Sequence, residues 1–233
     1  MCTLTFLPKS EDDFIVTSNR DEAPDRQTAP PAFVTYDKTQ LLFPKDALAG
    51  GTWIGLSDHQ RMICLLNGGF TAHEREDSYR MSRGIIVKEL LAASNLKRKI
   101  TSFDFKGIEP FTLISVSWKD RSELMELVWD GATPHFQEKP WKPTVWSSSL
   151  LYTNTMKTAR ETWFAQFLKE VPNPTKEELR TFHREAGKDY PEYSLVMDRG
   201  FVRTKSITQI SKDKNVSMWY QTLPSGTAEE IIF

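Results

Sequence analysis

Polar and apolar residues alternate at the start of the chain, which is the pattern of a half-buried strand. Residues 2–7 alternate in this way, a polar turn follows over residues 9–12, and residues 14–18 return to apolar and β-branched side chains. The pattern predicts a hairpin within the first 21 residues. With the turn centred near residues 10 and 11, Cys2 lies opposite about Asn19. The N-terminus is therefore predicted to lie beside residues 19–22, Asn-Arg-Asp-Glu.

The rest of the chain is predicted to form short strands and three helices. The further strands are predicted over 53–56, 62–66, 111–118, 123–129, 201–207 and 216–221. Apolar residues at helical spacing predict helices over about 82–93 and 156–170, and a capping box of Thr175 and Glu178 starts a third. The proline-rich segment 23–31 is predicted to leave the sheet, and residues 225–233 to form a loosely held tail. This order favours antiparallel sheets with helices grouped on the outside.

Composition is that of an ordinary soluble protein. Hydrophobic residues make up 39% and charged residues 26% of the 233 residues, a length that fits one domain spanning 1–233. Thirty basic and 31 acidic residues give a net charge of −1, which argues against a nucleic-acid partner. No apolar run approaches the roughly 20 residues of a membrane span, and no signal peptide is recognisable. We therefore expect a cytoplasmic protein without stable membrane insertion.

Motifs for common cofactors are missing from the sequence. It has neither a dinucleotide-binding nor a triphosphate-binding glycine loop, and its four histidines are scattered without the spacing of a zinc site. We therefore expect no cofactor and no metal. The spacing leaves a papain-like Cys-His pair open, although no histidine has a neighbourhood that favours it. Cys64, within an apolar run, is interpreted as a buried core thiol.

Cys2 is the residue that points to chemistry. If Met1 is removed, Cys2 carries a thiol and a free α-amino group, and an N-terminal nucleophile uses that amine as its base instead of a histidine. The amine has an ordinary pKa of about 7.7 to 8.0. Arg20 would lower the pKa of the thiol, and Asp21 would orient the ammonium group. The alternative interpretation is that a cysteine at position 2 is incidental and that residues 19–22 are a charged strand end.

The segment Asn19-Arg20-Asp21-Glu22 resembles the signature of the NRDE family, also called the transport and Golgi organization 2 family, whose members look like N-terminal nucleophile hydrolases. The resemblance extends to the opening Met-Cys and to four further segments: Gly-Gly-Thr-Trp-Ile-Gly-Leu-Ser at 50–57, Ser-Arg-Gly at 82–84, Leu-Leu-Tyr-Thr-Asn at 150–154 and Phe-Val-Arg-Thr-Lys-Ser at 201–206. It implies an α+β fold, a four-layer αββα sandwich of two antiparallel sheets flanked by helices, in a single NRDE-type domain.

The same resemblance implies site residues. In related N-terminal cysteine hydrolases, such as penicillin and bile-salt acylases, the nucleophile is followed by an arginine and an aspartate near the end of the next strand, and Cys2, Arg20 and Asp21 fit those roles. Asn154 matches an asparagine that helps to bind the tetrahedral oxyanion. Arg203 matches a late-strand arginine near the nucleophile.

Three residues are candidates for binding substrate. Asn67 is similar to a second asparagine at the end of a central strand, although many family members have Thr-Asn-Tyr where this chain has Leu-Asn-Gly-Gly. Asn19 belongs to the segment that the hairpin brings to the N-terminus. Trp53 follows two glycines that would let a substrate approach the backbone, but it equally fits a residue packed between strands.

Two functions are therefore predicted. The leading one is an N-terminal cysteine hydrolase that cleaves an amide or related acyl bond of a small substrate. The alternative is a non-catalytic carrier or scaffold, linked to membrane traffic, that binds a hydrophobic ligand such as a lipid or haem. No histidine or cysteine pair in the sequence marks a haem ligand set. The oligomeric state and the substrate are not predicted.

Overall fold

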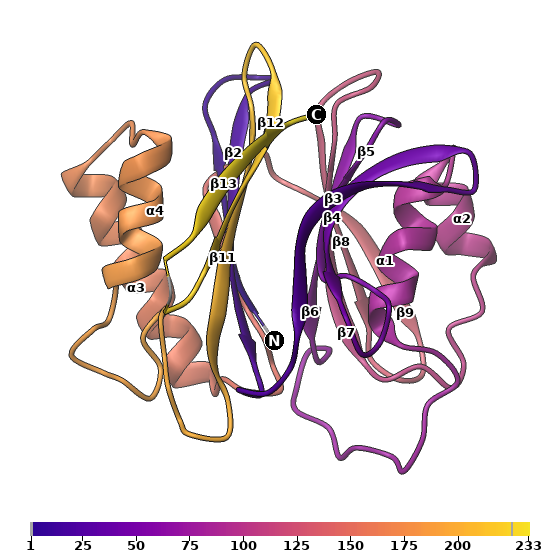
Figure 1. The fold of residues 1–233 in the computed structure, drawn as a ribbon, viewed down its shortest axis with the longest axis horizontal. Helices are drawn as coiled ribbons and strands as arrows, with labels where there is room; N and C mark the ends of the chain where they lie inside the picture. The colour runs from indigo at the N-terminus through magenta and orange to yellow at the C-terminus, as the bar shows by residue number, and fades with distance from the viewer. Residues whose placement is uncertain (1, 225) are drawn as a thin grey trace. The chain divides into compact units, whose positions relative to one another are not determined.

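The N-terminal hairpin predicted from the alternating pattern is present, and it forms the start of a six-stranded sheet (Figure 1). The computed structural model describes residues 2–224 and 226–233, apart from the side chain of Cys2. The described residues form two antiparallel sheets, as predicted, and four helices, one more than the three predicted. They divide into two units, the first comprising Met1–Asp25 and Lys142–Phe233 and the second Arg26–Trp141.

The sheet of the first unit has the strand order β10-β1-β2-β11-β12-β13. Its strands are β1 (Cys2–Pro8), β2 (Phe14–Glu22), β10 (Thr144–Ser147), β11 (Arg203–Lys212), β12 (Val216–Thr222) and β13 (Ala228–Ile232). Cys2 pairs with Arg20, one residue beyond the predicted partner Asn19. Because side chains alternate between the two faces of a strand, this single step decides which residues share a face.

Two helices, α3 (Asn154–Glu170) and α4 (Lys176–Glu185), lie on one face of that sheet (Figure 1). The predicted capping box begins α4, with the Thr175 hydroxyl accepting from the Glu178 backbone N–H at 3.2 Å. The apolar faces of both helices pack on the strands through Phe164, Leu179 and Phe182. Burial of these side chains holds the helices on the sheet.

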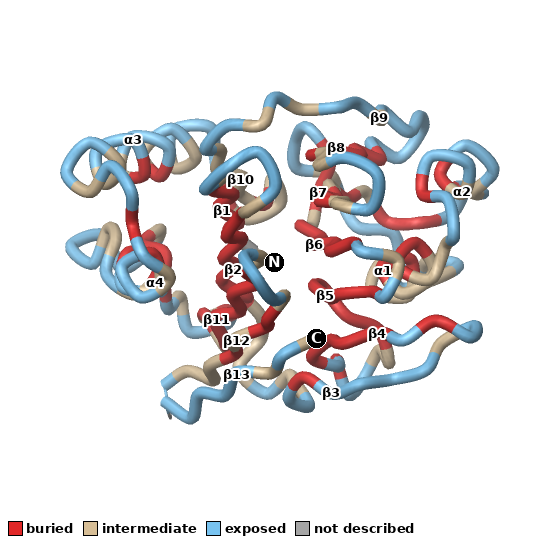
Figure 2. The backbone as a smooth tube through the Cα atoms, turned by 90° about the horizontal axis from the view of Figure 1, so that it is seen from above, coloured by how far each residue is buried: buried red, intermediate tan, exposed pale blue. Residues whose placement is uncertain are grey.

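The second unit has a seven-stranded sheet of order β3-β4-β5-β6-β7-β8-β9. Its strands are β3 (Thr28–Tyr36), β4 (Thr39–Asp46), β5 (Ile54–Ser57), β6 (Arg61–Asn67), β7 (Phe111–Ser117), β8 (Glu123–Trp129) and β9 (Pro134–Lys139). Helices α1 (Arg83–Ala92) and α2 (Leu96–Ser102) pack on it through an apolar cluster that includes Ile86, Leu90 and Leu91. Figure 2 shows the inner strands of each sheet mostly buried, and strands β3, β9 and β13 and the outer turns of the helices largely exposed.

Two segments differ from their predictions. The end of the proline-rich segment joins a strand, β3, which lies at the edge of its sheet, and its register shifts between Ala29 and Ala32 where two prolines lie. An edge strand with an irregular register tolerates proline because the missing N–H need not pair. In the predicted loose tail, Ser225 lies outside the described residues, but Ala228–Ile232 forms β13 and pairs with β12.

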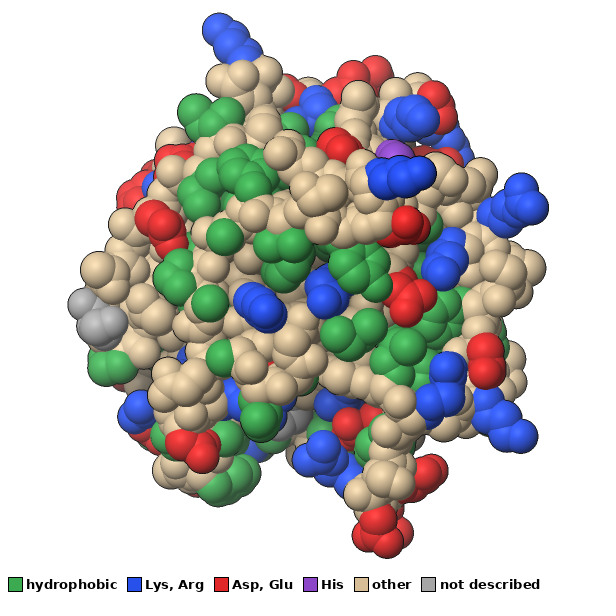
Figure 3. All heavy atoms as spheres, turned by 45° about the vertical axis from the view of Figure 1, so that its right-hand side comes forward, with side chains coloured by type: hydrophobic (Ala, Val, Ile, Leu, Met, Phe, Trp, Pro, Cys, Tyr) green, Lys and Arg blue, Asp and Glu red, His purple; other side chains and the backbone are tan. Residues whose placement is uncertain are grey.

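The surface agrees with the balanced numbers of acidic and basic residues in the sequence. On the face that Figure 3 shows, acidic and basic side chains are interspersed, and neither sign dominates. Among the described residues, no helix is long and apolar enough to cross a membrane.

Candidate active site

The pairing of three strands brings most of the predicted catalytic residues to one end of the first sheet. Cys2, at the start of β1, pairs with Arg20 in β2. The next two residues of β2 pair with the start of β11, Asp21 with Thr204 and Glu22 with Arg203. Met1, whose removal the predicted chemistry requires, and the side chain of Cys2 lie outside what the structure describes.

Asp21 lies on the face of the sheet that the helices cover, and it has no exposed surface. The hydroxyl of Tyr152 donates to its Oδ2 at 2.6 Å, and the hydroxyl of Thr204 donates to its Oδ1 at 2.7 Å. Burial raises the pKa of the Asp21 carboxyl, while the charge of Arg160 and the two hydrogen bonds oppose that rise. The carboxylate is therefore held in one orientation by donors from two different elements.

Arg160, on α3, is the largest polar side chain in this region and is 1% exposed. Its guanidinium lies over the ring of Tyr152, 3.5 Å from the centroid. Its Nε and Nη2 donate to the backbone carbonyls of Tyr193 and Ser194 at 3.0 and 2.8 Å, and its Nη1 donates to the hydroxyl of Thr3. Arg160 thus joins α3 to β1 and places a buried positive charge near Asp21.

Asn19 and His183 form a second buried group on the same face. The Asn19 amide nitrogen donates to the carbonyls of His183 and Leu195 at 3.0 and 2.7 Å, so its oxygen accepts from His183 Nδ1. His183 Nε2 is then the acceptor for the hydroxyl of Thr5 at 2.7 Å. Burial, and next the charge of Arg160, lowers the pKa of His183 to about 3, so the ring is neutral. The amide of Asn19 is engaged within the protein, which favours a structural role over the predicted contact with substrate.

Positive charge gathers where β2 and β11 meet. Arg20 is 3% exposed, and its Nη2 lies 3.5 Å from Glu22 Oε2. Arg203 is half-buried, and its Nε has no hydrogen-bond partner among the residues that the structure describes. Burial lowers the pKa of Lys205, and the charges of Arg203 and Arg20 lower it further, whereas the charges of Asp25 and Glu22 raise it. A cation beside a cysteine favours its thiolate, and Arg20 is the residue that pairs with Cys2 in the sheet.

Asn154, the predicted oxyanion residue, is the first residue of α3 and is exposed. It follows the helix cap Thr153, whose hydroxyl accepts from the Met156 backbone N–H at 3.4 Å. Tyr152, two residues earlier, is bonded to Asp21. The start of α3 is therefore fixed to the same strand end as Arg20 and Asp21.

Asn67 and Trp53 belong to the second unit, where the glycine motifs also meet. Asn67 ends β6 and pairs with Phe111, and Trp53 is 6% exposed, with its carbonyl accepting from the Leu65 N–H at 2.7 Å. Gly51 and Gly84 lie backbone against backbone, and a Cβ on Gly51 would come within 2.4 Å of the Gly84 carbonyl carbon. The substrate roles of Asn67 and Trp53 stay predictions, whereas the Gly-Gly-Thr-Trp and Ser-Arg-Gly segments have a packing reason.

Four residues that form the buried hydrogen bonds and ring contacts around Asp21 and Asn19 were not predicted, namely Tyr152, Arg160, His183 and Thr204. Tyr152 and Thr204 lie inside the segments that carry the family resemblance, so those segments could have indicated them. Arg160 lies four residues before Phe164 on one helix face, and His183 follows the buried Phe182. Charged or polar residues on an apolar helix face are a recognisable signal, because burial without a partner is costly.

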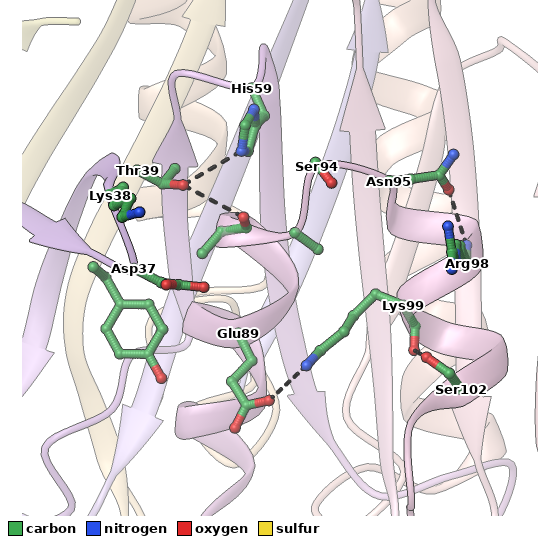
Figure 4. Close-up of a pocket in the computed structure, with 13 residues that line it drawn as sticks. Asp37, Lys38, Thr39, His59, Glu89, Ser94, Asn95, Arg98, Lys99 and Ser102 are labelled. Atoms are coloured by element: carbon green, nitrogen blue, oxygen red, sulfur yellow. Dashed lines mark hydrogen bonds and ion pairs between the residues drawn. The ribbon is translucent and has the colours of Figure 1, made fainter.

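The second unit holds a cavity of about 900 Å³ between the β3–β4 hairpin and helices α1 and α2 (Figure 4). Glu89 and Lys99 form an ion pair of 3.1 Å in its wall, and Thr39 and His59 form a hydrogen bond of 3.3 Å. None of the predicted site residues lines this cavity. Within the described part of the chain, no three histidine, cysteine, aspartate or glutamate side chains are grouped as metal ligands would be.

The fold is that of the N-terminal nucleophile hydrolases. A variant of conjugated bile acid hydrolase from Clostridium perfringens matches with a TM-score of 0.65 at 8% sequence identity, over 99% of this chain and 92% of that one. Penicillin V acylase from Agrobacterium tumefaciens matches with a TM-score of 0.55 at 9% identity, over 100% and 86%. An N-acylethanolamine-hydrolyzing acid amidase ortholog from Caenorhabditis elegans matches with a TM-score of 0.61 at 12% identity, over 90% and 92%.

At sequence level the chain has a more specific relationship. The model of the family Transport and Golgi organisation 2 matches residues 1–149, so the chain belongs to this family. No curated protein matches it in sequence. The family resemblance and the fold class predicted from the sequence are thereby confirmed.

Proposed function

We propose that the protein is an N-terminal cysteine hydrolase that cleaves an amide or related acyl bond of a small substrate once Met1 has been removed. The observation that carries the proposal is the register of β1 and β2, in which Cys2 pairs with Arg20 beside the buried Asp21. A hydrolase-like fold and the cations at the same strand end support it. The similar structures are described as a conjugated bile acid hydrolase, a penicillin V acylase and an N-acylethanolamine-hydrolyzing acid amidase, which makes acylated amines the first substrates to test.

The reaction proceeds in two halves. The α-amino group of Cys2 takes the thiol proton, and the sulfur attacks the carbonyl carbon to give a tetrahedral oxyanion. The oxyanion collapses, the bond to the leaving amine breaks, and the ammonium group protonates that amine as it departs. A thioester remains. Water then attacks the thioester, gives a proton to the α-amino group and releases the acid, and the proton returns to the sulfur.

Each neighbouring residue would stabilise or orient one of the charged groups of this reaction. Arg20 and Arg203 stabilise the thiolate, and Asp21 orients the ammonium group through its carboxylate, which Tyr152 and Thr204 hold in place. Asn154 donates to the oxyanion, and such a donor commonly contributes 100-fold or more to the rate. Its exposed amide at the start of α3 is consistent with a side chain that awaits a ligand.

The first experiment measures the state and the reactivity of Cys2. The intact mass of the purified protein reports whether Met1 is present, and a protein that keeps Met1 quantitatively would contradict the proposal. Iodoacetamide should then label Cys2 much faster than Cys64, which is fully buried. The matched comparison is the Cys64→Ala variant, which should keep the fast phase, against the Cys2→Ala variant, which should lose it.

The second experiment measures turnover on a panel of acylated amines and esters. Cys2→Ala should abolish release of the amine, and Asn154→Ala should reduce kcat by about 100-fold with little effect on stability, since the side chain is exposed. A protein with a fast-labelling Cys2 that turns over no member of the panel, yet retains a lipid or haem through purification, would favour the carrier function instead.

A further inference from the structure

Helices α3 and α4 form an apolar groove that the candidate active site does not use. The cavity between them measures about 480 Å³, and Trp163, Phe167, Val171, Phe182 and Ala186 line it. The rings of Phe167 and Phe182 are stacked with centroids 4.8 Å apart. We refer to this feature as the α3–α4 groove. Its walls come from the first unit alone, so its existence does not depend on the proposed hydrolase activity.

Three exposed glutamates, Glu170, Glu178 and Glu185, also line the groove, and no lysine or arginine does. The basic residues of α4 point elsewhere. Arg180 and Arg184 lie over the ring of Trp219, 4.7 and 5.5 Å from its centroid, and both pair with Glu177. Charge on α4 is therefore sorted, with the cations on one side and an acidic rim around the apolar groove on the other.

Two of these glutamates lie where the helix dipole does not favour a negative charge. Glu170 is the last residue of α3 and Glu185 the last residue of α4. A negative charge at a helix C-terminus is unfavourable, because the macrodipole is negative there. Glu178 differs, since its carboxylate accepts from the N–H and the hydroxyl of Thr175 in the capping box. Glu170 accepts a hydrogen bond from Gln166 at 3.0 Å, and the exposed Lys188 lies 3.9 Å from Glu185. Because surface contacts of this kind stabilise little and both carboxylates are exposed, an external cation can still pair with them.

We propose that the α3–α4 groove docks an amphipathic segment of a partner protein that carries apolar side chains flanked by lysine or arginine. The apolar floor takes the apolar side chains, in the manner of a helix laid into a hydrophobic groove. The acidic rim pairs with the basic ones and fixes their orientation. An anionic lipid surface does not suit a rim of three glutamates.

The test uses a fluorescein-labelled helical peptide of about 18 leucine and lysine residues, or five turns, with its leucines on one face. We expect the full-length protein to raise its fluorescence anisotropy saturably and less strongly at high salt. A matched peptide with glutamate in place of lysine should not bind. The double variant Glu170→Lys, Glu185→Lys should bind the basic peptide roughly tenfold more weakly. Both substitutions suit a helix C-terminus, so the variant should fold.

Control variants make the test specific to the groove. Glu161→Lys changes an exposed glutamate of α3 that does not line the groove, and it should leave binding unchanged. Thr181→Arg, at an exposed position within the groove, should weaken binding through bulk and charge. Equal binding of the acidic peptide, equal loss in Glu161→Lys, or unchanged affinity in the double variant would overturn the proposal. One further result would overturn the proposal. In it, the basic peptide does not bind, while the double glutamate variant or Thr181→Arg abolishes self-association or binding to phosphatidylcholine vesicles.

Discussion

The two sheets bury different chemistry beneath their helices. Under α1 and α2, the second sheet presents a largely apolar surface, with Leu41, Phe43 and Ile63 packed against the helices. Under α3 and α4, the first sheet packs against the helices through Leu7 and Ile15. Toward the end where Cys2 begins β1, the same face becomes polar, and Asp21 and His183 lie there without exposure.

The difference indicates which face is built for stability alone. An apolar contact tolerates changes of shape, whereas a buried polar group costs free energy unless every partner is present. On the helix-covered face of the first sheet, the side chains of Asn19 and Asp21 have such partners, and these come from α4, from β11 and from the residues before α3 and β11. This network fixes the strand end that carries Arg20 and Asp21, where the proposed chemistry takes place.

The largest effect is expected from removing the buried guanidinium of the first unit. Arg160→Met leaves the Asp21 carboxylate without the buried cation whose charge lowers its pKa and leaves two carbonyls unpaired, so the free energy of unfolding should fall by about 3 to 5 kcal/mol. Urea denaturation measures it.

Arg61→Met is the matched change in the second unit. Arg61 donates to the carbonyls of Leu90 and Ala93 at 2.7 and 2.9 Å, and burial lowers its pKa to about 10, with no opposing charge. Its removal should cost about 1 to 2 kcal/mol. If Arg160→Met and Arg61→Met lowered the free energy of unfolding equally, removing a buried arginine from the polar face of the first sheet would cost no more than removing one from the second unit.

The sequence predicted local features well and long-range polar contacts poorly. The hairpin and the capping box depend on residues close in the chain, and both are present. The short strands β9 and β10 and helix α2 were missed, because they are largely polar and carry no clear period. Strand β4 was also missed, although Leu41, Leu42 and Phe43 make its centre apolar and buried. Thr5 and His183 bond to each other across 178 positions, and neither residue alone indicates the other. The register of the hairpin was one residue off, since turn composition alone does not fix it.

The glycine contact of the second unit should be nearly as sensitive as Arg160. Gly51→Ala places a Cβ 2.4 Å from the Gly84 carbonyl carbon, and only backbone movement relieves that overlap, so we expect a loss of about 3 kcal/mol. Gly50→Ala is the control, because the space around its Cβ is open and only its φ of 68° opposes a side chain. It should cost about 1 kcal/mol. If the contact between Gly51 and Gly84 were loose, thermal unfolding would show a smaller loss of stability in Gly51→Ala than in Gly50→Ala.

Acid should weaken the first unit through His183. The folded protein keeps this ring neutral down to a pKa of about 3, whereas in the unfolded chain it takes a proton below about pH 6.5. The unfolded state therefore binds more protons in that window, and stability falls as pH falls, by about 2 kcal/mol from about pH 7 to about pH 5.

Asp21 contributes with the opposite sign, since burial raises its folded pKa, so the comparison must isolate His183. His183→Gln keeps one donor and one acceptor without a titrating ring. The difference between the two unfolding free energies, measured by urea at several pH values, should shrink on acidification as the wild type loses its advantage. A difference that stays constant with pH would mean that the folded and unfolded chains bind the same number of protons at His183, so that burial does not keep the ring neutral.

The smallest effect compares the starts of two helices. Thr175 caps α4 through its hydroxyl and forms a reciprocal capping box, so Thr175→Ala should cost about 1 kcal/mol. Ser82 occupies the same position before α1, but its side chain accepts no capping hydrogen bond within the described residues, so Ser82→Ala should be close to neutral. The start of α1 is held instead by the contact of Gly84 with Gly51 and by the 3.0 Å ion pair of Arg83 with Glu109. If the two alanine variants lost equal stability in urea, backbone packing would not replace a side-chain cap.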